Sequence, residues 1–227
     1  MREIVLDTET TGLDPVKGDR LVEIGAVEIV DLVATGRTYH VLINPERDVP
    51  EDAVRVHGHT TASLRDKPVF AHVVEKFLAF IGEDPLVIHN AEFDMRFLNA
   101  ELTMHGRAGI AAARIVDTLA LARRKHPGAA NSLDALCDRY RIDRSKRVIH
   151  GALLDAEILV EVYCELSGGR QRSLGLATLE PIVIAAPGAA PASRPAPLPP
   201  RLDEAAMAAH RAHLETFGAP AIWLKYA

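Results

Sequence analysis

The sequence is poor in cysteine and aromatic residues, and it has no long apolar run and no excess of positive charge. Its two cysteines, Cys137 and Cys164, cannot build a disulfide framework, so we expect a protein of the reducing cytoplasm. No apolar stretch approaches the ~20 residues that a transmembrane helix requires, and the amino-terminal one is too short for a signal peptide. These absences argue against a disulfide-stabilised secreted domain and against a membrane protein.

The lack of positive charge restricts how the protein could bind nucleic acid. The 26 lysine and arginine residues are outnumbered by 31 aspartate and glutamate residues, and the formal net charge is −5. Proteins that hold DNA by broad neutralisation of its phosphates are usually basic. If nucleic acid is the substrate, binding must therefore be local and metal-assisted, or a partner must hold most of the DNA.

The composition of the chain changes near Gly168 and Gly169. Apolar segments separated by turn signals precede this point. A stretch rich in alanine and proline follows it, and such a stretch cannot build a core. From Leu202 onward, apolar residues return at helical spacing. The sequence therefore predicts three parts, which are a globular domain at 1–169, a linker at 170–201 and a tail at 202–227.

The order of the predicted elements indicates the fold class. Segments rich in Val and Ile predict strands at 3–6, 21–30, 38–43 and 86–89. Apolar residues at helical spacing predict helices at 70–81, 91–104, 119–124, 132–140 and 153–166. Short connections favour antiparallel pairing of the first three strands, and strand and helix then alternate. We expect an α/β fold of the ribonuclease H-like kind, in which helices flank a mixed sheet of three antiparallel strands plus parallel strands.

Two acidic residues come directly after the first predicted strand. Asp7 and Glu9 are two positions apart, and such residues point to the same side of an extended backbone. Carboxylates this close repel each other unless a cation lies between them, and oxygen ligands of this kind suit Mg²⁺ or Mn²⁺ rather than zinc. An isolated D-x-E is more often a polar strand end that runs into a loop, so the pair alone does not decide.

Two further acids and a histidine occur at predicted helix starts. Asp94 lies in the first turn of one helix, and His150 and Asp155 lie before and within the first turns of another. Taken singly, each acid could complement the helix dipole, and His150 could be a solvated loop residue. Together with Asp7 and Glu9 they can converge on one point. Two-metal phosphoryl transfer needs such a cluster, in which two cations ~4 Å apart hold the reacting oxygens and a base activates water.

The segments that carry these residues read D-x-E-T-T-G, then H-N-A-x-F-D, then H-G-A-L-L-D-A. This pattern resembles the DEDDh exonuclease family and, within it, the proofreading subunits of bacterial replicases. The segments N-S-L-D-A-L-C and S-K-R, which precede His150, resemble those subunits as well. The resemblance covers residues 2–169, and four residues separate His150 from Asp155, as in the histidine branch of the family. It implies a metal-dependent enzyme that removes nucleotides from the 3′ end of DNA as 5′-monophosphates.

The resemblance also implies the roles of the acids and the histidine. Asp7, Glu9 and Asp155 would bind two catalytic divalent cations, Mg²⁺ or Mn²⁺. Asp94 would hold the second cation directly or through water. His150 would be the general base that activates the attacking water.

A further set of residues would contact the terminal nucleotide of the substrate. The resemblance implies that this set contains Asp7, Glu9, Thr10, Leu13, Asp52, His57 and Asp155. For His57, the alternative is a residue of a surface turn next to Gly58. His89 and Phe93 would shape the wall of the pocket, although a packing role explains them equally well.

The segment directly after the predicted domain resembles a short protein-binding motif. Residues 171–176 are similar to the motif with which bacterial replication proteins bind the sliding clamp. Its anchors would be Gln171, Leu174 and Leu176. The alternative is the start of a plain linker, because so short a pattern has many chance matches.

The tail contains an apolar group that a small segment cannot bury alone. It consists of Ile222, Trp223 and Leu224, and Trp223 is the only tryptophan of the chain. Aromatic anchors of this kind are typical of protein interfaces. The resemblance implies that the partner is the polymerase catalytic subunit, in a replisome associated with the nucleoid. The alternative is a tail that docks on its own domain.

Two other functions compete with a proofreading DNA exonuclease. The first is a related exoribonuclease that trims RNA 3′ ends, which the acidic cluster alone does not exclude. The second is a non-catalytic adaptor between polymerase and clamp. The complete set of acids argues against the adaptor, because so many carboxylates are costly to hold together without cations.

Overall fold

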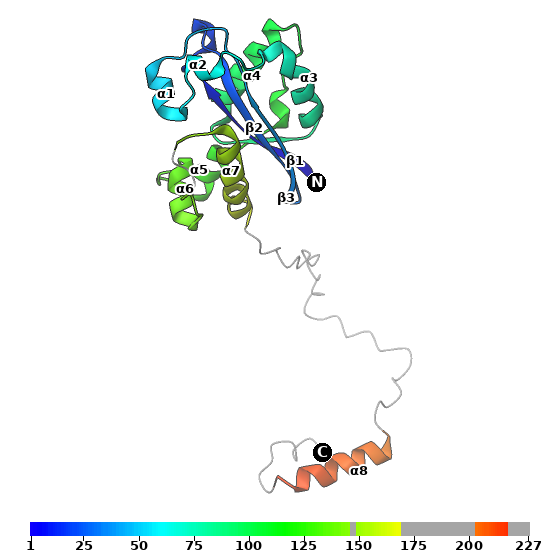
Figure 1. Ribbon diagram of the computed structural model, residues 1–227. Helices are drawn as coiled ribbons and strands as arrows, with labels where there is room; N and C mark the ends of the chain where they lie inside the picture. Colours follow the sequence, from blue (N-terminus) through cyan, green and yellow to red (C-terminus); the bar gives the residue numbers. More distant parts are fainter. Residues whose placement is uncertain (146–148, 169–202, 218–227) are drawn as a thin grey trace, which may run out of the picture. The chain divides into compact units, whose positions relative to one another are not determined.

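The computed structural model describes residues 1–145, 149–168 and 203–217 (Figure 1). The chain divides into two units, at residues 1–176 and 177–227, which we describe separately. The predicted clamp motif at 171–176 and the predicted polymerase anchors at 222–224 lie outside the described residues. None of the helices within the described ranges combines the length and the apolar character that crossing a membrane requires.

A mixed five-stranded sheet forms the centre of the first unit, with strand order β3-β2-β1-β4-β5. Its strands are β1 (Arg2–Thr10), β2 (Leu21–Val30), β3 (Val33–Leu42), β4 (Leu86–Ile88) and β5 (Ile115–Asp117). The first three pair antiparallel, whereas β4 runs parallel to β1 and β5 runs parallel to β4. The predicted fold class is therefore confirmed. Strand β5 escaped prediction because it has only three residues, all partly exposed, and so shows no apolar run.

Helices cover both faces of the sheet. The α-helices are α1 (Glu51–His57), α2 (Thr61–Leu64), α3 (Phe70–Ile81), α4 (Ala91–Met104), α5 (Thr118–Lys125), α6 (Leu133–Tyr140), α7 (Ala152–Leu166) and, in the second unit, α8 (Glu204–Glu215). Short 3-10 helices occur at Pro15–Lys17 and Ala112–Arg114. The structure confirms the helices predicted at 70–81 and 91–104. It adds α1 and α2, which are too short to show a clear apolar period.

The helices form two layers, one on each face of the sheet, and each layer packs on the sheet through its own apolar cluster (Figure 1). Ile4 and Leu6 of β1 point toward α3 and α4, whereas Val5 points toward α5, α6 and α7. Because side chains alternate along a strand, odd-numbered residues of β1 share the side that α7 covers. The same alternation places Thr8 on the α4 side of the sheet.

Gly25 of β2 allows α7 to approach the sheet closely. A Cβ atom at this position would lie only 2.2 Å from the backbone carbonyl carbon of Ala152, which opens α7. Any side chain here would push the start of the helix away. Gly25 is the direct strand partner of Asp7. The missing side chain therefore lets the α7 backbone lie against the sheet next to Asp7.

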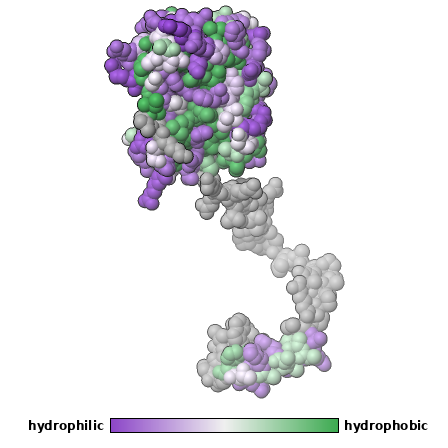
Figure 2. All heavy atoms as spheres, viewed as in Figure 1, coloured by the Kyte–Doolittle hydropathy of each residue, from purple (hydrophilic) through white to green (hydrophobic). Residues whose placement is uncertain are grey.

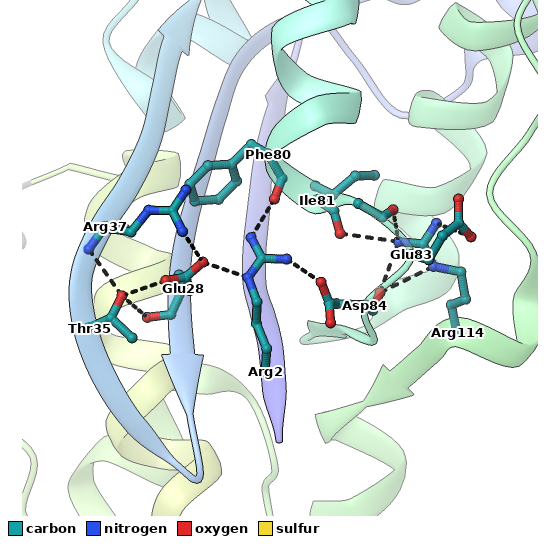
Figure 3. Close-up of polar contacts among 10 residues, drawn as sticks. Arg2, Glu28, Thr35, Arg37, Phe80, Ile81, Glu83, Asp84 and Arg114 are labelled. Atoms are coloured by element: carbon teal, nitrogen blue, oxygen red, sulfur yellow. Dashed lines mark hydrogen bonds and ion pairs between the residues drawn. The ribbon is translucent and has the colours of Figure 1, made fainter.

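A polar network stabilises the end of the sheet at which β1 begins, away from Asp7 and Glu9 (Figure 3). Arg2 of β1 binds the Glu28 carboxylate at 2.5 Å, donates to the Phe80 carbonyl at 2.7 Å and also pairs with Asp84. Glu28 accepts further hydrogen bonds from Thr35 and Arg37, each at 2.9 Å. The network joins β1, β2 and β3 to the end of α3. It lies at the start of β1, whereas Asp7 and Glu9 lie toward its end.

The second unit is described only at residues 203–217. Asp203 accepts a hydrogen bond from the backbone N–H of Ala206 and so caps α8. The helix predicted beyond Leu202 is therefore present, as α8. Of its predicted apolar face, Leu214 is 3% exposed, whereas Phe217, just after the helix, is 65% exposed.

Candidate active site

Asp7 and Glu9 lie within β1, not after it as the sequence predicted. The reason is that β2 continues to pair with them, Asp7 opposite Gly25 and Glu9 opposite Glu23. A register shift follows between Glu9 and Thr10, where the chain leaves regular pairing. Both acids occupy the side of the sheet that α7 covers. The prediction that they share one side is thus consistent with the observed strand.

Glu9, His150 and Asp155 form a compact group with one potential ligand atom each. Within the described part of the chain, these three atoms all lie within 4.8 Å of one another. Nδ1 of His150 lies 3.2 Å from Oδ2 of Asp155. Asp155 is 3% and Glu9 is 9% exposed, whereas the side chain of His150 is 47% exposed. Two buried carboxylates next to an accessible imidazole are a set of donors that fits a divalent cation.

Backbone contacts determine where His150 and Asp155 lie. The backbone N–H of His150 donates to the carbonyl of Val56 at 3.1 Å, which ties His150 to α1. Asp155 lies in the first turn of α7, and its backbone N–H donates to the Gly151 carbonyl at 2.9 Å. Since Gly25 lets this turn lie against the sheet, Asp155 comes within reach of Glu9.

Asp94 is held by a contact on the other side of β1. It lies in the first turn of α4, and its Oδ1 accepts a hydrogen bond of 2.7 Å from Thr8 Oγ1. Burial raises the pKa of Asp94 from 3.8 to about 7, although the Thr8 hydrogen bond opposes the rise. Neither Asp94 nor Asp7 belongs to the compact group among the described residues. Their roles as metal ligands remain predictions.

The raised pKa of Asp94 predicts how stability depends on pH without metal. Neutral Asp94 contributes stability that is complete below about pH 4 and is lost as the pH rises through about 7. Asp94→Asn keeps an acceptor for Thr8 and buries no charge. We expect the variant to be the more stable protein at pH 8, because it buries no charge there, and to lose this advantage at pH 5. Urea unfolding at pH 5 and pH 8 with chelator measures this difference, and equal pH dependence of both proteins would contradict it.

Repeating the unfolding experiment with Mn²⁺ tests whether Asp94 binds the cation. A cation favours the ionised form of any carboxylate that binds it. If Asp94 is a ligand, Mn²⁺ at pH 8 should stabilise the wild type more than Asp94→Asn. Equal stabilisation of the two proteins would remove Asp94 from the set of ligands.

His57 is buried at the end of α1 and is not a residue of a surface turn. Its Nδ1 accepts a hydrogen bond of 3.0 Å from the backbone N–H of His59, so in the neutral ring the proton is on Nε2. That Nε2 is buried and makes no hydrogen bond of regular geometry among the residues described, although the backbone of Thr10 lies close enough to favour the protonated ring. Burial and the nearby His59 lower the pKa of His57. A neutral buried donor whose hydrogen bond is not of regular geometry is well suited to a ligand.

The remaining predicted contacts differ in position. The side chain of Asp52 is 88% exposed and pairs with Arg55 of its own helix, so nothing in the structure brings it to the compact group. Thr10 Oγ1 donates to the Gly12 carbonyl at 2.6 Å and holds the loop after β1. Leu13, in that loop, is 78% exposed.

His89 and Phe93 make the packing contacts that were one of their two predicted roles. Nδ1 of His89 lies 2.9 Å from Thr118 Oγ1 at the start of α5. Burial lowers the pKa of His89. The ring of Phe93 packs at 5.1 Å from that of Phe97. The His89 contact joins the segment before α4 to the start of α5, whereas the Phe93–Phe97 contact lies within α4.

Exposed apolar side chains occur in segments that carry site residues. Figure 2 shows hydrophobic residues among hydrophilic ones on the surface of the first unit. The large ones include Leu13 and Val16 in the loop after β1, and Val56 and Ile149 beside His57 and His150. The Ile149 side chain also lies against Gly58. Such side chains can contact the apolar face of a base.

Three residues around the site were not singled out from the sequence. They are Thr8, Glu23 and Gly25. Glu23 had a visible signal, because it is one of two glutamates, with Glu28, inside a strand that is otherwise apolar. Burial raises the pKa of Glu23, but contacts with His59 and His40 outweigh this effect and keep the pKa below its usual value. Thr8 and Gly25 had no such signal, since their roles depend on strand pairing.

The mixed sheet and the group of buried acids are consistent with a nuclease, and comparison with known proteins shows this class. Residues 4–163 match the exonuclease family, so the chain belongs to this family. Exonucleases of this family depend on divalent metal ions. The chain is 55% identical to the DNA polymerase III subunit epsilon of Rickettsia felis over 174 residues, which cover 75% of this chain and 76% of that protein. It is 45% identical to the same subunit of Escherichia coli over 200 residues, which cover 80% and 82%.

Solved structures show the same fold. Exonuclease X in complex with 5′-overhanging duplex DNA has a TM-score of 0.58 at 27% identity, and covers 72% of this chain and 90% of its own. Exonuclease I has a TM-score of 0.64 at 17% identity, and covers 73% of this chain and 40% of its own. With the identity to the epsilon subunits, these findings make the chain a 3′→5′ exonuclease of the proofreading type.

Proposed function

We propose that the first unit hydrolyses the terminal phosphodiester at a DNA 3′ end, with Asp7, Glu9, Asp94 and Asp155 as the metal-binding acids. The compact group of Glu9, His150 and Asp155 is the observation that supports this most directly. Two divalent cations, Mg²⁺ or Mn²⁺, would supply charge stabilisation for the attacking and leaving oxygens. The products would be a nucleoside 5′-monophosphate and a strand shorter by one nucleotide.

His150 is the general base in this proposal. Asp155 lies 3.2 Å from its Nδ1 and would orient the ring, so that Nε2 takes the proton from water. The exposure of the His150 side chain gives water access to the ring. The backbone contact to Val56 limits how far the histidine can move from the acids.

The terminal nucleotide would lie between the loop after β1 and the end of α1. His57 would donate from its buried Nε2 to the nucleotide, because that proton makes no hydrogen bond of regular geometry within the described residues and has only the backbone of Thr10 nearby. Thr10 and the exposed Leu13 would contact the sugar and base from the other segment. None of these groups reads base identity. Preference for a mismatched end would arise because an unpaired end costs less to unstack than a paired one.

The chain would act as part of a DNA polymerase III assembly. The relatives are named as its epsilon subunits, and the net charge of −5 favours a partner that holds the DNA. We propose that Gln171, Leu174 and Leu176 bind the sliding clamp, and that residues 222–224 bind the polymerase catalytic subunit. The domain plan then has an exonuclease domain at 1–169, a linker at 170–201 and a binding tail at 202–227. A tether of this kind raises the local concentration of the exonuclease at the primer end.

A primer–template with a mismatched 3′ end and a 5′ label tests the activity. The wild type with Mg²⁺ should produce a ladder that shortens from the 3′ end. Asp7→Ala and added chelator should both abolish the ladder, whereas Asp66→Ala, at an exposed acid, should retain it. Shortening of RNA but not DNA would replace the proposal with an exoribonuclease. If neither is cut, the adaptor function replaces it, and binding to polymerase and clamp becomes the measurement.

A further inference from the structure

Glu23 lies directly across from Glu9 in the antiparallel pair of β1 and β2. Residues paired in this way project to the same side of the sheet, with Cβ atoms roughly 5 Å apart. Glu23 is 4% exposed, so a third buried carboxylate stands next to the two of the compact group. A buried carboxylate in this place is costly unless other groups neutralise it and satisfy its oxygens.

Two histidines from different segments satisfy the oxygens of Glu23. Nε2 of His40 in β3 lies 2.7 Å from Oε1, and Nε2 of His59, just after α1, lies 3.0 Å from Oε2. Each carboxylate oxygen therefore has its own imidazole. Glu23 is therefore better suited to hold neighbouring segments together than to bind a metal ion, because both of its oxygens already have partners.

Glu23 and its partner His59 also contact the two segments that carry His57 and His150. The His59 ring stacks on His57 at 5.2 Å between centroids, and the His59 backbone donates to His57 Nδ1. The backbone N–H of Ala152, at the start of α7, also stabilises the charged form of Glu23. Three residues further along this helix lies Asp155. Glu23 thus connects β2 and β3 with the residues that hold His57 and with the helix that holds Asp155.

We propose that Glu23 is a positioning residue of the active site, which fixes the start of α7 and the segment after α1 relative to Glu9. This inference rests on the proposed nuclease function of the site. Glu23 would act through its neighbours and would not touch the substrate. Its loss should therefore disturb the spacing of Glu9 and Asp155 more than the affinity for DNA.

Glu28 provides a matched control on the same strand. It is also 4% exposed and also has several hydrogen-bond partners, but it faces the other side of the sheet at the distant end (Figure 3). Glu23→Ala, Glu23→Gln and Glu28→Ala would be compared with the wild type at a temperature at which all four are folded. The measurements are kcat and KM on a single-stranded oligonucleotide, the Mn²⁺ concentration for half-maximal rate, and the rise in Tm that Mn²⁺ produces.

We expect Glu23→Ala to lower kcat by about 10- to 100-fold and to raise the Mn²⁺ requirement by a similar factor, with little change in KM. Glu23→Gln keeps the shape and one acceptor oxygen, so it should recover part of both losses. Glu28→Ala should lower Tm but keep the wild-type kcat and the wild-type response of Tm to Mn²⁺. Wild-type kcat and Mn²⁺ response in Glu23→Ala would overturn the inference, as would equal defects in Glu23→Ala and Glu28→Ala.

The Mn²⁺ response separates this inference from the proposed function. If the wild type releases no nucleotide, the nuclease proposal fails, and the rise in Tm alone decides the role of Glu23. A smaller rise in Glu23→Ala than in Glu28→Ala would still support positioning of the carboxylates. If Glu23→Ala does not fold, Glu23→Gln carries the comparison, and a wild-type profile in that variant counts against the inference.

Discussion

Replacement of Asp155 by Asn is expected to lower the rate of nucleotide release by about 10³-fold, which corresponds to ~4 kcal/mol of transition-state stabilisation. Asn has the same shape and can still accept the contact from His150, so the change removes mainly the negative charge. Asp155 is 3% exposed and lies in the compact group with Glu9 and His150.

Single-turnover release from a 3′-labelled oligonucleotide in Mg²⁺ measures this loss. Glu157→Gln removes an exposed charge from the same helix and should leave the rate unchanged. Asp155→Asn should also respond less to Mn²⁺ in thermal unfolding, because it lacks one ligand for the cation. If Asp155→Asn kept more than about a tenth of the wild-type rate, Asp155 would not be a metal ligand in the reaction.

Replacement of His150 by Gln is expected to lower kcat by about 10²- to 10⁴-fold at pH 7, the usual contribution of a positioned general base. Gln can keep a hydrogen bond to Asp155 but cannot take a proton from water. The deficit should shrink as the pH rises, because hydroxide from the solvent then replaces the missing base. The Mn²⁺ response of Tm should change less than in Asp155→Asn if His150 acts on water and is not a principal ligand.

Comparison of kcat across pH 6 to 9 for the wild type and His150→Gln tests this role. His72→Gln is a suitable control, because His72 lies exposed on α3, on the side of the sheet opposite α7. A constant ratio of the two rates over the whole range would argue that His150 positions the acids and does not transfer a proton. A large loss of Mn²⁺ response would instead make it a ligand, as its place in the compact group allows.

Much of the fold was predictable because it depends on local patterns. The apolar period of α3 and α4 and the Val- and Ile-rich run of β2 predicted those elements with their observed bounds. Strand β5 and helices α1 and α2 were missed, because three to seven residues carry too little pattern. The longer β1 was missed for another reason, since its last residues are polar and are strands only because β2 pairs with them.

The sequence by itself determined which chemical groups the site could use. Four acids, a histidine and the spacing of two of the acids on one strand were all visible without coordinates. The tertiary structure decided which of them meet. Glu9 and Asp155 come together because Gly25 leaves room for the α7 backbone, while Asp94 is held by Thr8 on the α4 side of β1. Likewise, only strand register places Glu23 beside Glu9. Pairing and close packing join residues far apart in the chain, so neither can be read from a local pattern.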